Sequence, residues 1–309
     1  MDADSSKPLI GIVLVNYNGM KFMPDCLKSL TKITYPNAKL VIIDNASTDG
    51  SADWVEQIYP SLNLLRLQSN SGITGGNNTG IKWCLQQQCE YILLLNNDTV
   101  VMPDFLNYLV EHADNRTMTV PKIYFYDQKE LINNHIGAFS YWRVIHLDWF
   151  YGMKDSPASC CVRNASMANT CALLVPRQVI TDVGIMDDQF FIYFDDIDFI
   201  ARAIRKRFKI KFVPNAIIYH RESSSTGGAE SPLTVYYQAR NRLYFCLKHN
   251  RRRPDRLIFS LSYFVVTRSI RAIQHILRGK PILARAIFRG SVDFLFGRMG
   301  FTTPSRYKA

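Results

Sequence analysis

The chain has 309 residues, a length that allows one large α/β domain with an appendage or two modest domains. Of these residues 47% are hydrophobic, which excludes an extensively disordered protein. Its net charge of +11 is uneven: residues 1–198 carry 14 Lys and Arg against 22 Asp and Glu, and residues 199–309 carry 23 against 4. The longest apolar stretch late in the chain, residues 257–267, is far short of the ~20 residues needed to span a bilayer. We therefore expect an acidic catalytic body followed by a basic tail half.

The seven cysteines are odd in number and form no CxxC pair. Reduced thiols in a cytoplasmic protein are the simplest interpretation. The polar N-terminus leads directly into strand-like sequence, so no signal peptide is expected.

Strands and helices alternate strictly along the first hundred residues. Strands are predicted at 9–15, 40–44, 62–67 and 91–95, and helices at 22–30, 51–58 and 77–88. This alternation implies right-handed βαβ units and a parallel sheet of a nucleotide-binding type.

The pattern then becomes irregular, with aromatic strand-like segments at 123–126 and 139–147 that indicate a mixed sheet with an acceptor-facing surface. Further along, the sequence predicts a helix at 199–208, a strand at 210–219 interrupted by Pro214, a flexible Ser- and Gly-rich loop at 221–232, and helices at 233–248, 255–277 and 282–296.

The apolar run 91–95 ends in the sequence NND, which places Asp98 at the carboxyl end of a predicted strand. Open α/β sheets bind their ligands at that edge, and a carboxylate there can hold a hard divalent cation against a diphosphate. The alternative is an Asp that caps the next helix or turn. A site role for Asp98 is favoured because other polar clusters end strands in the same way.

Two of these clusters follow the first and second strands. Asn16 opens an NYNG turn that can present backbone groups to a ligand. Asp44 and Asn45 begin the run DNASTDG, in which an Asp followed by Asn, Ser and Thr can read a nucleobase imide and ribose hydroxyls. An ordinary Asx turn and helix cap is an equally good explanation of this second cluster.

The third cluster, residues 70–80, is a Gly- and Asn-rich loop that opens the third helix, and its backbone amides suit an anion. Its glycine spacing matches neither the dinucleotide fingerprint nor a P-loop. A plain flexible turn is the alternative.

The fourth cluster places Asp195, Asp196 and Asp198 at the start of a helix. The helix dipole favours acids there, so capping is one explanation. Three like charges also raise the pKa of one carboxyl, as a general base requires. His220 ends a strand before a flexible loop, and a ligand role and a structural role are equally open for it.

In this order the clusters resemble the inverting nucleotide-sugar glycosyltransferases of family 2, of the rhamnosyltransferase-like bacterial type. The matching segments cover nearly the whole chain: VNYNG, VIIDNASTDGS, NSGITGGNNTG, LLLNNDTVVMPDFL, FFIYFDDIDFIAR, FVPNAIIYH, YYQARNRLYF and GSVDFLFGRMG. The resemblance implies a GT-A fold, which is an α/β, Rossmann-like mixed sheet flanked by helices, with basic amphipathic helices at the C-terminus. It places the GT-A domain at residues 1–250, divided into a nucleotide-sugar half (1–100) and a metal and acceptor half (101–250), and a membrane-associating helical region at 251–309.

The resemblance also implies a nucleotide site. Asp44 is expected to contact the base or ribose, aided by backbone near Asn16. The residues expected around the nucleotide are Asn16, Asp44, Asn45, Asn77 and Asn97.

A divalent metal, Mn²⁺ or Mg²⁺, and a catalytic base are implied in the same way. Asp98 stands where the family places the metal-binding Asp-x-Asp motif, and His220 matches a further metal ligand. Asp196 matches the catalytic base. Three neighbours are secondary candidates: Asn96, which replaces the first Asp of the motif and lowers the charge of the metal site, Asp195, which replaces the commoner Glu, and Asp198.

Arginines are interleaved with Leu, Ile and Phe throughout residues 251–309. Basic amphipathic helices of this kind lie on anionic membrane surfaces, where an acceptor on a lipid diphosphate would be found. A solvated basic face and a nucleic-acid patch are the alternatives. Nucleic acid is disfavoured as a partner because the same helices carry long apolar faces.

We therefore expect a cytoplasmic enzyme, peripheral to the inner face of the plasma membrane, that moves one sugar onto a lipid-linked saccharide acceptor for a bacterial surface polysaccharide. The donor expected from the resemblance is dTDP-rhamnose, and a UDP-hexose such as a galactose donor is nearly as well supported. The rival is a non-catalytic nucleotide-sugar-binding subunit, which Asn96 favours and which Asp98, Asp196 and His220 oppose.

Overall fold

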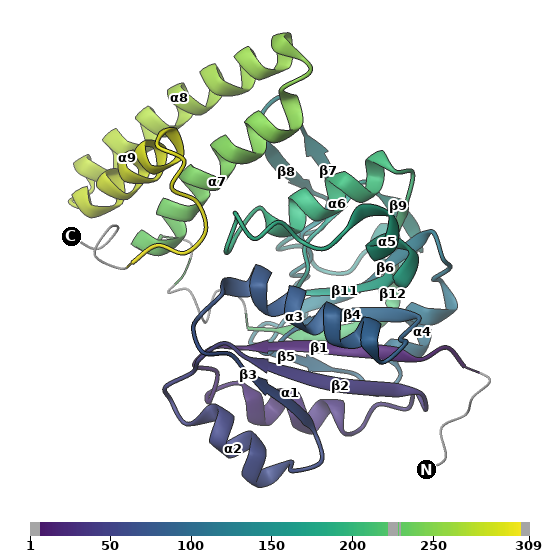
Figure 1. Ribbon diagram of the computed structural model, residues 1–309. Coiled ribbons are helices and arrows are strands. Elements are labelled where there is room, and N and C mark those ends of the chain that lie inside the picture. The colour runs from purple at the N-terminus through teal and green to yellow at the C-terminus, as the bar shows by residue number, and fades with distance from the viewer. Residues whose placement is uncertain (1–6, 222–227, 229, 304–309) are drawn as a thin grey trace.

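The computed structural model describes residues 7–221, 228 and 230–303 (Figure 1), so most of the predicted loop at 221–232 lies outside the described residues. Within these ranges a nine-stranded sheet has the order β3-β2-β1-β4-β11-β6-β12-β5, with β9 paired to β12. The strands of this sheet are β1 (Ile10–Asn16), β2 (Ala38–Asp44), β3 (Asn63–Arg66), β4 (Tyr91–Asn96), β5 (Thr99–Val101), β6 (Thr117–Phe125), β9 (Arg163–Ala165), β11 (Ala172–Pro176) and β12 (Lys209–His220).

Strands β1 to β4 are parallel to one another, as their alternation with helices predicts. Strand β11 joins this group antiparallel to β4, and β5 and β9 are antiparallel to β12. The sheet is therefore mixed, which confirms the expected mixed sheet of an α/β architecture. The register of β12 against β6 shifts between Val213 and Ile217. Pro214, which cannot donate to the ladder, lies at this irregularity.

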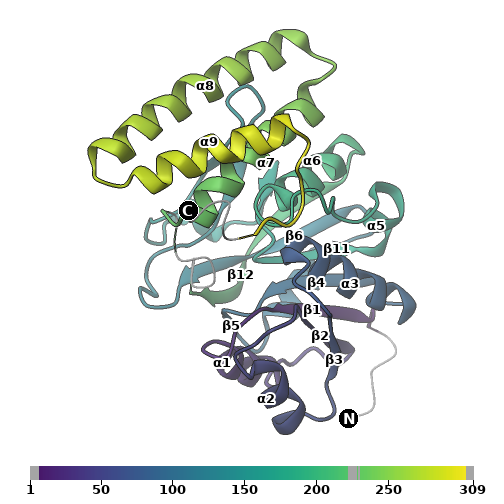
Figure 2. The same cartoon turned by 60° about the vertical axis from the view of Figure 1, so that its left-hand side comes forward.

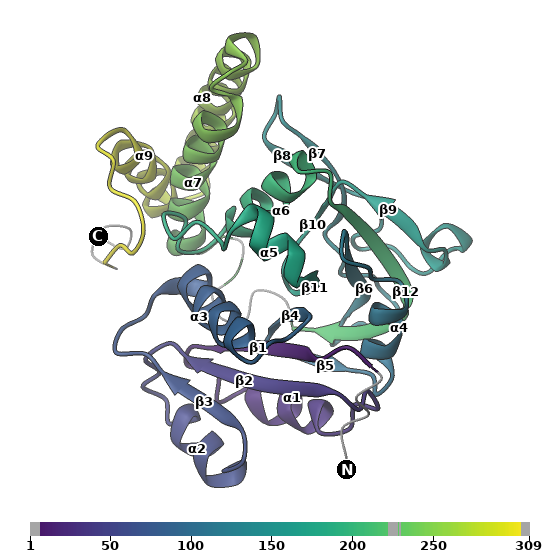
Figure 3. The ribbon, with the colours of Figure 1, turned by 45° about the vertical axis from the view of Figure 1, so that its right-hand side comes forward.

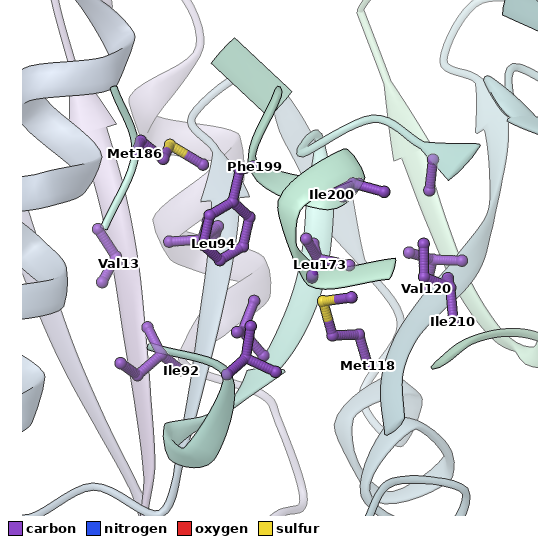
Figure 4. Close-up of a cluster of buried hydrophobic side chains, with 14 of the residues drawn as sticks. Val13, Ile92, Leu94, Met118, Val120, Leu173, Met186, Phe199, Ile200 and Ile210 are labelled. Carbon is purple, nitrogen blue, oxygen red and sulfur yellow. The ribbon is translucent and has the colours of Figure 1, made fainter. Parts of the chain in front are cut away.

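Helices cover both faces of the sheet (Figure 3). Alternate residues of β1 point to opposite faces: Val13 packs with α3, α5 and α6, and Ile12 and Leu14 pack with α1 and α4. Figure 4 shows the first of these two cores, where Phe199 of α6 meets Leu94 and Leu173 of the sheet. The helices are α1 (Met23–Leu30), α2 (Ser51–Ile58), α3 (Gly72–Gln86), α4 (Phe105–Glu111), α5 (Arg177–Val183), α6 (Asp195–Arg205) and a short 3-10 helix (Pro157–Cys160).

Helix α3 begins at Gly72, five residues before the predicted start, so most of the predicted glycine-rich loop is helical. The reason is close packing, because a Cβ added to Gly76 would lie 2.6 Å from Val15 and one added to Gly80 would lie 2.2 Å from Val13. These glycines let the helix approach β1, a role that their loop-like composition did not indicate.

A second, three-stranded sheet has the order β10-β7-β8 among the described residues. Its strands are β7 (Ile136–Ser140), β8 (Ile145–Asp148) and β10 (Met167–Ala168). The predicted segment 139–147 is therefore divided between two antiparallel strands of a hairpin.

Three helices end the chain: α7 (Pro232–Asn250), α8 (Pro254–Leu277) and α9 (Pro281–Leu295). Each begins at a proline, which suits a first helical turn because its fixed φ is already helical and its missing N–H needs no partner there. In Figure 2, α8 and α9 lie side by side and apart from the main sheet. Across the described ranges, no helix combines the length and apolar character required to cross a bilayer.

Candidate active site

A cavity of about 650 Å³ lies beside the carboxyl end of β4, among the β7–β8 hairpin, the start of α6 and the first turns of α7. Its lining includes Asn96, Asp98, Asp195, Asp196 and His220, which the sequence singled out. It also includes residues that the sequence analysis did not select: Ile73, His135, His146, Asp148, Tyr151, Asn169, Thr170, Cys171, Tyr193, Thr234 and Gln238.

Asp98 and His220 meet at one side of this cavity. Pairing of His220 with Thr99 brings the end of β12 beside the β4–β5 turn, and Asp98 Oδ1 lies 3.2 Å from His220 Nε2. Burial lowers the pKa of His220, but the Cys171 sulfur and the Asp98 carboxylate outweigh burial and raise it well above 6.5.

This pair fits a divalent cation that also binds a diphosphate. Asp98 Oδ1 is buried and has no well-aligned hydrogen-bond donor, and carboxylate oxygen with imidazole nitrogen suits Mn²⁺. No group of three or more His, Cys, Asp or Glu side chains in the described part of the chain is arranged to hold a metal. Asp98 and His220 would therefore supply two ligands, and donor phosphate oxygens would have to supply others.

Three of the residues predicted for the nucleotide are joined by hydrogen bonds. Asn16 and Asp44 are paired at the ends of β1 and β2, and Asn16 Nδ2 donates to Asp44 Oδ1 at 2.9 Å. Asn97 Nδ2 donates to Asn16 Oδ1, also at 2.9 Å. The network lies at the ligand-binding edge of the parallel strands. Its three members do not line the cavity, but Asn97 lies between the cavity residues Asn96 and Asp98 in sequence.

The other two predicted nucleotide residues make contacts that hold α3. Asn45 Oδ1 accepts from the Ser71 N–H at 2.8 Å, and its Nδ2 donates to the Gly72 carbonyl at 2.8 Å. Asn77 is buried, with Nδ2 3.8 Å from the Met186 sulfur. Neither side chain lines the cavity, and their nucleotide role stays a prediction.

Asp195 and Asp196 are the first two residues of α6, and both line the cavity. Burial and the charge of Asp196 raise the pKa of Asp195 well above 3.8. Burial likewise raises the pKa of Asp196, although the Ile197 N–H and the charges of His146 and His135 act in the opposite direction. The Asp196 carboxyl is half-buried, and a carboxyl at a cavity wall whose proton is held more tightly than usual suits a general base.

Asp198, a secondary candidate, faces away from the cavity. Its carboxylate contacts Arg202 Nε at 2.8 Å, Lys248 Nζ at 2.8 Å and His249 Nε2 at 2.7 Å. Burial opposes ionisation, but His249, Arg202 and Lys248 lower its pKa to about 2. In this structure Asp198 joins α6 to α7.

A His–Asp–His group on the β7–β8 hairpin is the main feature that the sequence analysis missed. Asp148 Oδ2 lies 3.1 Å from His135 Nδ1, and Asp148 Oδ1 lies 2.5 Å from His146 Nδ1. Despite burial, these two contacts lower the pKa of Asp148 well below 3.8. The available signal was the His-x-Asp spacing of residues 146 and 148, which places both on one face of a strand.

Comparison with known proteins identifies the family. The family model described as "Glycosyl transferase family 2" matches residues 11–171, more than half of the chain. The low-salt glycan biosynthesis hexosyltransferase Agl10 of Haloferax volcanii is 21% identical over 293 residues, which cover 93% of this chain and 87% of that protein. The dTDP-rhamnosyl transferase RfbF of Shigella flexneri is 24% identical over 254 residues, which cover 77% and 80%.

Two solved structures share the fold. The mannosyltransferase PcManGT of Pyrobaculum calidifontis, in complex with GDP-Man and Mn²⁺, has a TM-score of 0.56 at 13% identity and covers 95% of this chain and 89% of its own. GalNAc-T7 with UDP, GalNAc and Mn²⁺ has a TM-score of 0.56 at 14% identity over 79% of this chain, which spans 51% of that longer chain. The predicted enzyme class, a glycosyltransferase that uses a nucleotide-sugar donor, is confirmed at this level, and the chain belongs to glycosyl transferase family 2.

Proposed function

We propose that the protein is an inverting glycosyltransferase in which Asp196 deprotonates the acceptor hydroxyl. The observation that carries this proposal is the half-buried Asp196 carboxyl, with a raised pKa, on the wall of a cavity that also contains Asp98 and His220. A single base is sufficient when the acceptor attacks the anomeric carbon in line, because no covalent sugar–enzyme intermediate forms.

Asp98 and His220 would hold a divalent cation, Mn²⁺ or Mg²⁺, on the donor diphosphate, and Asn96 lies beside them in the cavity. Such a cation, when bound, neutralises charge on the departing nucleoside diphosphate. The described cavity lining includes four carboxylates and no Lys or Arg, which supports the need for a cation when a diphosphate enters.

For the nucleotide we propose the hydrogen-bonded group of Asn16, Asp44 and Asn97, with Asn45 and Asn77 supporting it through α3. The proposed donor is dTDP-rhamnose, which the similarity to the dTDP-rhamnosyl transferase supports. A UDP-hexose is the second candidate, favoured by the longer match to a hexosyltransferase.

The experiment is a thermal-shift panel of dTDP, UDP, GDP and their sugars with and without Mn²⁺ or Mg²⁺, followed by turnover of the best donor. Stabilisation by one nucleotide is expected because a ligand that binds only the folded state raises stability. Asp196→Asn should abolish turnover and leave nucleotide stabilisation intact, whereas Asp182→Asn, at an exposed position on α5, should change neither. Nucleotide binding by a wild-type protein that shows no turnover would favour the non-catalytic subunit, and unchanged turnover in Asp196→Asn would remove Asp196 as the base.

We further propose that the acceptor is a lipid-linked saccharide and that the enzyme acts in the cytoplasm at the inner face of the plasma membrane. Large apolar side chains of α8 lie exposed on one face at helical spacing: Ile258, Phe259, Val265, Val266, Ile270, Ile273, Ile276 and Leu277. Phe288, Leu295 and Phe296 are exposed on or next to α9. With the excess of arginine in residues 251–309, this surface fits an anionic bilayer.

Cosedimentation with phosphatidylglycerol vesicles, compared with phosphatidylcholine vesicles, tests this surface. Replacing Ile273 and Leu277, which are 56% and 81% exposed, by Glu should release the protein. Ile58→Glu, at a 52% exposed position on α2, is the control and should still bind. Absence of vesicle binding together with a dimer that the double variant dissociates would identify the surface as a protein interface.

A further inference from the structure

The five residues that precede Asp195, Phe190–Phe194, form a segment that we call the strap. Three of them have positive φ angles: Phe191 at 66°, Tyr193 at 63° and Phe194 at 66°. Bulky residues rarely adopt this conformation, and each costs on the order of 1–3 kcal/mol unless its surroundings impose it. The strap therefore needs external restraint, and the position of the Asp196 backbone depends on that restraint.

Asn241 of α7 supplies the most direct restraint. Its Nδ2 donates to the carbonyl oxygens of Phe190 at 2.8 Å, Ile192 at 2.7 Å and Tyr193 at 2.9 Å. The Asn241 side chain is fully buried. One amide group with two hydrogens thus holds three carbonyl groups of a strained segment.

Asn241 is itself oriented by its neighbour. Arg240 Nε donates to Asn241 Oδ1 at 3.0 Å, which fixes the amide with its nitrogen toward the strap. Arg240 is fully buried, and burial lowers its pKa. Its guanidinium also reaches the carbonyl oxygens of Phe190 and Arg298, each at 3.4 Å.

The strap is also tied to the residues that follow α9 and to α3. The Gly300 N–H donates at 2.9 Å to the carbonyl of Gln189, the residue just before the strap, and the Thr74 N–H donates to the Phe191 carbonyl at 3.3 Å. The strap therefore lies between the donor-side helix α3 and the C-terminal helices.

We infer that Asn241 is a positioning residue that sets the orientation of Asp196 by holding the strap, so that α7 forms part of the catalytic unit. The inference rests on the proposed role of Asp196 as base. It gives a role to the motif YYQARNRLYF, whose Arg240 and Asn241 do not line the cavity.

The test compares Asn241 with a matched residue on the same helix. Asn250 is also fully buried, and its Nδ2 donates to the Tyr141 carbonyl at 3.0 Å and to Ser260 Oγ at 3.1 Å, not to the strap. Asn241→Ala and Asn250→Ala each remove a buried amide and should lower the melting temperature to a similar extent. Asn241→Asp keeps the shape of the side chain but cannot donate to the three carbonyl groups.

Two measurements are made at a temperature where all variants are folded. Hydrogen exchange of the peptide that covers residues 192–197 should become about tenfold faster or more in both Asn241 variants and stay unchanged in Asn250→Ala. With the donor found in the nucleotide panel, kcat should fall about tenfold or more in the Asn241 variants only, with donor KM within about twofold, because small displacements of a reacting group cost rate rather than binding.

Unchanged exchange in Asn241→Ala would overturn the restraint. Faster exchange with a loss of kcat no greater than that of Asn250→Ala would overturn the positioning role. Full turnover in Asp196→Asn would instead refute the proposed base, and the exchange measurement would still decide whether Asn241 holds the strap.

Discussion

Substitution of Gly72 by Ala tests how rigidly the strap is seated. Gly72 begins α3 with φ at +75°, and a Cβ there would lie 2.2 Å from the Phe191 carbonyl oxygen and 2.6 Å from Phe191 Cδ2. Real Cβ atoms essentially never come this close to another heavy atom, so either α3 or the strap must move.

The magnitude has two parts. An Ala in the left-handed region costs roughly 1–2 kcal/mol. Overlap with a neighbour that cannot yield adds about 1–3 kcal/mol. Gly279 isolates the first part, because its φ is +70° and an added Cβ meets nothing within 4 Å. Gly279→Ala should therefore lower the free energy of unfolding by about 1–2 kcal/mol, and Gly72→Ala by about 2–5 kcal/mol.

Denaturant titration of both variants measures this difference, with equal slopes required for the comparison. Gly72→Ala should also lower turnover more than Gly279→Ala, because the displaced Phe191 lies only five residues before Asp196. Equal losses of stability in the two variants would refute the reasoning, because the strap would then move away from the added methyl group without any further loss of free energy.

Three further predictions concern charged groups. Burial and the charge of Asp196 raise the pKa of Asp195, so the folded state binds the Asp195 proton more tightly than the unfolded state and wild-type stability falls as pH rises above 3.8. In denaturant titrations, Asp195→Asn should therefore be more stable than wild type at pH 8 and should lose this advantage toward pH 3.8. The pKa of Asp198 is lowered to about 2, so its ion pairs add stability that is fully present at pH values above the ordinary Asp pKa and is lost as pH falls through about 2. Asp198→Asn should lower the free energy of unfolding by about 2 kcal/mol at pH 7. A smaller loss at pH 7 than at pH 3 would contradict this. Asp98→Ala should remove the part of the nucleotide thermal shift that requires Mn²⁺ and leave the metal-independent part, and an unchanged metal response would place the cation elsewhere.

The positions of several candidate side chains follow from strand periodicity alone. Consecutive βα units place the ends of β1, β2 and β4 at one edge, and this explains why Asn16, Asp44 and Asp98 are near neighbours although they are far apart in sequence. Their hydrogen-bond partners did not follow from the pattern. Asn45 is therefore indistinguishable from Asp44 in the sequence pattern, whereas its side chain holds the start of α3.

Other features depend on contacts that local sequence does not encode. His135 had no motif context, and only the antiparallel pairing of β7 with β8 brings it to Asp148, whereas His146 meets Asp148 through its own strand. The glycines at 76 and 80 resembled a loop because glycine composition does not distinguish a flexible turn from a helix packed closely on a strand.

The predicted division of the chain at residue 250 stays a prediction, and the contacts across it argue that the two parts act together. Gly290 of α9 packs so closely on α7 that an added Cβ would lie 2.5 Å from the Tyr236 carbonyl oxygen, and the Tyr236 hydroxyl donates to Asp293 at 2.7 Å. A protein ending at residue 250 would lose these contacts and the bond from Arg240 to the Arg298 carbonyl, and would expose the side of α7 that packs on α9.

Such a truncated protein is therefore expected to lose turnover as well as membrane binding, so truncation cannot separate the two properties. Glu substitutions at Ile273 and Leu277 can separate them, because these side chains are exposed on α8 and do not face α7 or the strap. If they abolish vesicle binding and leave turnover of a soluble acceptor unchanged, the exposed face of α8 serves the membrane while α7 serves the base. If the Glu substitutions lower turnover of the soluble acceptor as much as they lower vesicle binding, α8 is linked to the strap more tightly than the hydrogen bonds through Arg240 and Asn241 require.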